Sequence, residues 1–119
     1  MAKIKVNGTE LNVAATEPEW AERYETALYK LAETEKKHTV KTSTSKFIKD
    51  YCDAIMAFFT DLFGEKAAAD ALGEPNATAY LRCLTAVLTE SGRCIDECAA
   101  AFGEIQSLAE GKKKKGGKK

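Results

Sequence analysis

The sequence predicts a mainly α-helical fold: an N-terminal β-hairpin at about residues 3–13, then a compact bundle of about four helices, then a disordered basic tail. Three observations support this prediction. An Asn-Gly pair separates two short segments of alternating polarity near the N-terminus. Apolar residues then recur at spacings of three and four, as on one face of a helix. Glycines at 64 and 73 each follow such a segment, where they can end a helix.

The chain has 119 residues, which is enough for one domain with one modest core. We therefore expect a single helical domain over residues 1–110 and a disordered lysine and glycine tail over residues 111–119.

The hairpin is predicted from residues 3–13. Asn7-Gly8 suits the positive φ angles of a two-residue type I′ turn. The apolar residues of the two flanking strands can then share one face; they are Ile4, Val6, Leu11 and Val13. An isolated hairpin is only marginally stable in water, so this face must be covered. The favoured interpretation is that it packs on its own domain, and the alternative is that its edges join strands of another subunit.

The first helix is predicted to begin with a capping box of Thr16 and Glu19, with Pro18 in the first turn. Its apolar stripe includes Trp20 and Tyr24. These two aromatic side chains are candidate anchors for a partner, although aromatic residues at this spacing are more often part of a core. His38 lies in the polar region after this stripe and is interpreted as a surface residue rather than a catalytic base.

The second helix is predicted to be the centre of the fold. Residues 42–45 form a short polar connection that supplies its N-cap. Its apolar residues cover well over a third of its circumference, so neighbours must cover it on two sides. They are Phe47, Ile48, Tyr51, Cys52, Ile55, Met56, Phe58, Phe59, Leu62 and Phe63.

A short helix and a long one are expected to follow. Gly64 and Gly73 bound an alanine-rich helix, because glycine adopts the left-handed conformation without a Cβ penalty. No Gly-Lys-Ser/Thr follows them, which argues against a phosphate-binding loop. Asn76 is the expected N-cap of the next helix. The Ser91-Gly92 pair predicts one long bent helix, or two in succession, ending around Ala109.

The four cysteines lie within helical apolar patterns, so we interpret them as small core residues with reduced thiols; they are Cys52, Cys83, Cys94 and Cys98. Regulatory disulfide chemistry is the alternative. A zinc site is not expected, because Cys94 and Cys98 are four apart and no second short-spaced pair accompanies them. The sequence therefore predicts no metal and no cofactor.

The charge is distributed unevenly along the chain. The formal net charge is zero, but six of the eighteen basic residues are lysines of the tail, which leaves twelve basic against eighteen acidic residues before it. An acidic body argues against a nucleic-acid-binding core. The lysines of the tail, Lys112, Lys113, Lys114 and Lys115 foremost, are candidate partner-binding residues that could contact nucleic acid or an acidic protein. A solubilising end is the competing interpretation.

The sequence contains no set of residues that predicts catalysis. It has one histidine, no G-x-S-x-G sequence and no carboxylate pair in an expected cleft. We therefore expect a protein–protein interaction module and not an enzyme. No signal peptide and no apolar run of about 20 residues is present, which predicts a cytoplasmic protein that does not enter a membrane.

Three segments resemble a family of small prophage proteins from Gram-positive bacteria: KIKVNGTELNV, AERYETALYKL and FFTDLFGEKAAADALGEPNATAYLRCLTAV. Those proteins are encoded in tail-gene clusters and are similar to phage tail assembly chaperones. The resemblance covers most of residues 3–90, whereas residues 92–102 and the lysine tail depart from it.

The resemblance implies a function in virion assembly. A protein of this kind would bind the tape-measure protein, and tail-tube subunits with it, in the cytoplasm of the bacterial host during tail morphogenesis. Two alternatives stay open: a virion structural protein of the tail or the head–tail joint, and a nucleic-acid-associated accessory protein that acts through the lysine tail. Self-association into a homo-oligomer is also left open.

Overall fold

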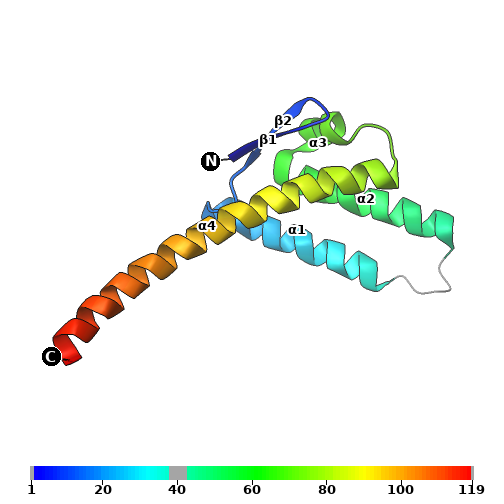
Figure 1. Ribbon diagram of the computed structural model, residues 1–119. Helices are drawn as coiled ribbons and strands as arrows, with labels where there is room; N and C mark the ends of the chain where they lie inside the picture. Colours follow the sequence, from blue (N-terminus) through cyan, green and yellow to red (C-terminus); the bar gives the residue numbers. More distant parts are fainter. Residues whose placement is uncertain (1, 38–42, 119) are drawn as a thin grey trace.

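The computed structural model describes residues 2–37 and 43–118, with side chains up to residue 110. These ranges hold two strands and four helices (Figure 1); they are β1 (Ala2–Val6), β2 (Thr9–Val13), α1 (Pro18–Lys36), α2 (Thr44–Phe63), α3 (Glu65–Leu72) and α4 (Ala77–Lys118). The predicted fold class, a helical domain behind an N-terminal hairpin, is confirmed. The prediction for His38 concerns a residue outside the described ranges.

The hairpin forms as predicted. Asn7 and Gly8 have φ angles of 50° and 80°, and the antiparallel register places Ile4 opposite Leu11. Val6, Leu11 and Val13 are buried. Strand β1 contacts α4 and strand β2 contacts α3, both in the same chain. The hairpin therefore covers its own domain, which was the favoured interpretation.

The start of α1 corrects one detail of the prediction. The helix begins at Pro18, its N-cap is Glu17, and no side chain caps it, so the Thr16–Glu19 capping box is absent. Proline disfavours the helical conformation in the residue before it, and Glu17 accordingly has an extended ψ of 130°. Thr16 is thereby placed one residue too early to act as the N-cap.

Helix α2 is central, as expected. Ser43 caps its N-terminus by accepting a hydrogen bond from the backbone N–H of Lys46 at 3.2 Å. The helix contacts α1, α3 and α4. Burying its large apolar side chains stabilises the fold by roughly 1.5–3 kcal/mol each; the buried residues are Cys52, Ile55, Phe58, Phe59 and Leu62.

Two glycines form the corner between α2 and α4. Gly64 has φ 90° and ψ 161°, and Gly73 has φ 69° and ψ −150°. The positive φ angles agree with the prediction, but both ψ values lie outside the left-handed helical region, in a region that essentially only glycine occupies. Gly64 serves both helices, because its N–H donates to the carbonyl of Thr60 and its carbonyl accepts from the N–H of Ala68.

Side chains fasten the corner to the hairpin and to α4. The Nδ2 group of Asn7 donates to the carbonyl oxygen of Ala71 at 2.7 Å and contacts the Cys83 sulfur at 3.6 Å. The hydroxyl of Tyr80 donates to the carbonyl of Gly73 at 2.8 Å. Asn76 caps α4 as predicted, accepting from the N–H of Ala79 at 3.0 Å. Carbonyls at the end of α3, which have no partner within the helix, are satisfied in this way.

Helix α4 is longer than the sequence predicts. It runs without a break through Ser91-Gly92, which was one of the two predicted alternatives, and its backbone continues to Lys118, past the end expected near Ala109. At 1.5 Å per residue, α4 is about 63 Å long, which accounts for most of the 67 Å maximum extent of the molecule.

Candidate partner-binding surface

The second half of α4 projects beyond the rest of the domain (Figure 1) and carries a row of apolar side chains that the domain leaves largely uncovered. We call this row the α4 stripe; it consists of Ile95, Cys98, Phe102, Ile105 and Leu108. Phe102, Ile105 and Leu108 are 66%, 62% and 71% exposed. In the first half of the same helix, Tyr80 and Val87 are almost fully buried. The apolar face of α4 therefore continues past the point where the domain covers it.

The acidic residues of this segment lie away from the α4 stripe. At 100° per residue, Asp96 lies about 160° from the centre of the α4 stripe, and Glu97, Glu104 and Glu110 lie about 100–120° from it, outside the apolar arc. The residues that flank the stripe are small or uncharged, such as Ala99, Ala101 and Gln106. An apolar row of this kind, with charge confined to the rest of the circumference, suits contact with another amphipathic helix.

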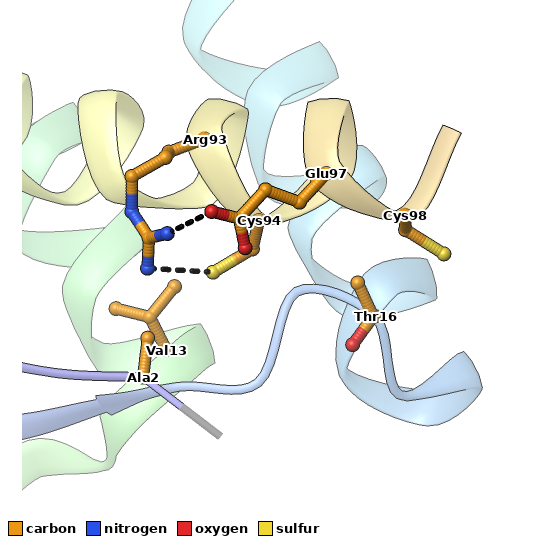
Figure 2. A pocket seen from close by; sticks show the side chains of 7 residues that line it. All are labelled: Ala2, Val13, Thr16, Arg93, Cys94, Glu97 and Cys98. Carbon is orange, nitrogen blue, oxygen red and sulfur yellow. Dashed lines mark hydrogen bonds and ion pairs between the residues drawn. The ribbon is translucent and has the colours of Figure 1, made fainter. Parts of the chain in front are cut away.

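A cavity of about 380 Å³ lies at the base of the projecting segment, where α4 passes the hairpin and the start of α1 (Figure 2). Its lining residues are Ala2, Val13, Thr16, Arg93, Cys94, Glu97 and Cys98. Figure 2 shows the Arg93 guanidinium between Glu97 and the Cys94 sulfur, which lies 3.8 Å from its Nη2 atom.

The charge of Arg93 is already compensated within α4. Its guanidinium pairs with the carboxylate of Glu90 at 2.6 Å and with that of Glu97. The hydrogen bond from Arg93 lowers the pKa of Glu90, and the same interaction raises the pKa of Arg93. This arginine therefore forms an intrahelical ion pair, and none of the described residues that line the cavity offers an uncompensated cation to an anionic ligand.

We found no arrangement for catalysis or metal binding in the described part of the chain. Within those residues, no three His, Cys, Asp or Glu side chains come close enough together to hold a metal ion. Cys52 and Cys83 are buried, and burial raises the pKa of both thiols, which keeps them protonated. Cys94 and Cys98 are half-buried. None of the helices described is both long and apolar enough to cross a membrane.

The residues proposed from the sequence as partner contacts fall in two places. Trp20 and Tyr24 are buried and stack on each other with ring centroids 5.5 Å apart, and Trp20 also contacts Phe63. They belong to the core, which was the favoured interpretation, and offer no exposed face to a partner. The backbone of Lys112, Lys113, Lys114 and Lys115 lies in the last turns of α4. Their side chains are outside the described part.

The sequence analysis identified the apolar residues of the α4 stripe but interpreted them as core. Whether an apolar helix face is buried or exposed depends here on the length of the helix relative to its neighbours. Helices α1 and α2 have 19 and 20 residues, about 30 Å each. They cannot cover a 42-residue helix along its whole length. The exposed stripe thus follows from the helix lengths.

Comparison with known proteins shows the family of the chain. Residues 7–118 match the model of a family described as a family of unknown function (DUF6673), and the chain belongs to that family. No curated protein and no solved structure matches it.

Proposed function

We propose that this member of the DUF6673 family is a phage tail assembly chaperone: a non-enzymatic protein that binds the tape-measure protein, together with tail-tube subunits, in the cytoplasm of the bacterial host. Two lines of reasoning support the proposal. Most of residues 3–90 resemble small prophage proteins from tail-gene clusters. The observation that carries it is the α4 stripe, which exposes large apolar side chains along a projecting helix.

The α4 stripe has the properties that a holder of apolar helices needs. A tape-measure protein, as the resemblance implies, presents long apolar helices that must stay soluble until the tail tube forms around them. Three side chains that are each more than 60% exposed can be covered by one such helix. Covering each contributes roughly 1–2 kcal/mol, before the entropy cost of association. Such a contact is weak enough to release the tape-measure protein when tube subunits replace it.

Co-expression tests the proposal. The tape-measure protein of the same gene cluster is expressed alone, with the wild-type chain, or with a Phe102→Ser/Ile105→Ser variant. We expect the wild type to keep it soluble and to co-elute with it on size exclusion, and the double variant to do neither.

Tyr29→Ser is the matched control, because Tyr29 is as exposed as Phe102, at 66%, but lies on α1. It should retain full activity. If the wild type neither raises tape-measure solubility nor forms a complex, the proposal is wrong. Finding the chain in purified phage particles would favour the virion structural alternative, since a chaperone leaves before the particle is complete.

A further inference from the structure

When no partner protein is bound, the apolar side chains of the α4 stripe are in contact with water, which is unfavourable. We propose that two copies of this chain associate through this stripe, with their α4 helices antiparallel, so that each copy covers the apolar side chains of the other. The inference does not depend on the tail-chaperone function, because it concerns only the free protein. Its support comes from periodicity, from charge and from the point at which the domain stops covering α4.

Four residues of the stripe, Ile95 to Ile105, belong to a row with the spacing of a two-helix interface, and Leu108 lies beside this row. Along α4, side chains at alternating intervals of three and four form one continuous row; they are Leu88, Ser91, Ile95, Cys98, Phe102, Ile105 and Ala109. Ser91 is fully buried within its own domain, whereas Ile95 is 41% exposed and Phe102 is 66% exposed. The row therefore passes from an intramolecular contact to an open one. Since the positions beside it are uncharged, a second helix can cover it without removing a charge from water.

Charge along the helix selects the direction of the second copy. Between residues 96 and 110 the charged side chains are all acidic: Asp96, Glu97, Glu104 and Glu110. Lysines follow at 112–115 and 118 on the same continuous helix. With Phe102 of one copy opposite Ile105 of the other, antiparallel helices place Lys112–Lys115 of each copy opposite residues 92–95 of the other. The charged residues around that stretch are Glu90, Arg93, Asp96 and Glu97, which together carry a net charge of −2. A parallel pair would instead align lysines with lysines and carboxylates with carboxylates.

The part of α4 that the domain already covers limits the register in which the two α4 helices can pair. Pairing can begin only beyond Ser91, and the apolar row ends before Lys112. The exposed part of the row runs from Ile95 to Ala109, and its midpoint is Phe102. Phe102 of one copy then packs against Ile105 of the other, and the same contact repeats across the twofold axis. The two most central residues of the interface are thus two of the most exposed apolar residues of the single chain.

Sedimentation velocity of the purified full-length chain tests the inference at low salt. We expect a concentration-dependent species of twice the 13.0 kDa chain mass. Phe102→Ser/Ile105→Ser should raise the dimer dissociation constant at least about tenfold, because it removes the centre of the interface. Tyr29→Ser, which removes an equally exposed aromatic side chain from α1, should leave the constant unchanged. Circular dichroism verifies that each variant is folded, which the exposure of the substituted residues predicts.

Replacing Lys112–Lys115 by glutamine tests the direction. An antiparallel pair loses attraction and dissociates more readily, whereas a parallel pair would lose repulsion and tighten. A tighter dimer overturns the antiparallel arrangement. A wild-type chain that stays monomeric, or a dimer that the Phe102→Ser/Ile105→Ser variant forms equally well, overturns the inference as a whole.

The two proposals fail in different ways. A dimer without any effect on tape-measure solubility rejects only the chaperone function, and a monomer that keeps the tape-measure protein soluble rejects only the self-association.

Discussion

Replacing Gly64 by alanine should destabilise the protein through backbone strain alone. Gly64 has φ 90° and ψ 161°, a conformation that costs a residue with a Cβ about 1–3 kcal/mol. A Cβ built at this position meets no heavy atom within 4 Å, so no steric clash adds to the cost. The expected loss of unfolding free energy is therefore about 1–3 kcal/mol, or roughly 4–12 °C in Tm for a domain of this size.

Gly92→Ala is the matched control. A Cβ at Gly92 also meets nothing within 4 Å, but this residue lies inside helix α4. Alanine is favoured over glycine in a helix by about 1 kcal/mol, so this variant should be more stable than the wild type. The same chemical change, one added methyl group in open space, is thus expected to have opposite signs at the two positions.

Urea denaturation followed by circular dichroism measures both variants. All samples are compared at one protein concentration, because self-association would make apparent stability depend on it. The reasoning is refuted if Gly64→Ala is as stable as the wild type, or if the two substitutions change stability in the same direction.

Two further predictions concern the Asn7 side chain and a set of buried ionisable groups. Asn7→Asp keeps a residue that tolerates the positive φ of the turn but removes the Nδ2 donor to the Ala71 carbonyl, so urea denaturation should show a loss of about 0.5–1.5 kcal/mol; an unchanged midpoint would contradict the role of this hydrogen bond. Unfolding free energy should also fall as pH rises above about 9. Burial raises the pKa of Cys52, Cys83 and Tyr80 above their values in the unfolded chain. The stability that these protonated groups contribute is therefore fully present below the pKa of the unfolded chain, and it is lost as the pH rises through the pKa of the folded chain. Denaturation midpoints that stay constant from pH 8 to 11 would contradict this.

Local features of the fold were predictable because they depend on neighbouring residues. The turn at Asn7-Gly8, the caps at Ser43 and Asn76, and the helix ends at Gly64 and Gly73 each follow from the backbone chemistry of one or two residues. The predicted start of α1 was wrong because two local signals compete there, a proline and a capping box. Pro18 fixes its own φ and holds the residue before it out of the helix, and this outweighs a capping box that begins at Thr16.

The candidate surface was harder to predict because exposure is a property of the whole fold. Periodicity shows that Phe102 and Ile105 share a face with Ile95, but not whether another helix covers that face. Trp20 and Tyr24 illustrate the converse, since their pattern is equally apolar and they are buried. Only the relative lengths and positions of the helices separate the two cases.

The attachment of the hairpin to the corner determines when the domain can be completed during synthesis. Asn7 bonds to groups 64 and 76 residues further along the chain, at Ala71 and Cys83. The hairpin leaves the ribosome before α3 and α4, the helices that it contacts, and alone it is only marginally stable. Val6, Leu11 and Val13 stay open to solvent for that interval. The strands are therefore covered only when α4, which is made after α1, α2 and α3, packs against them.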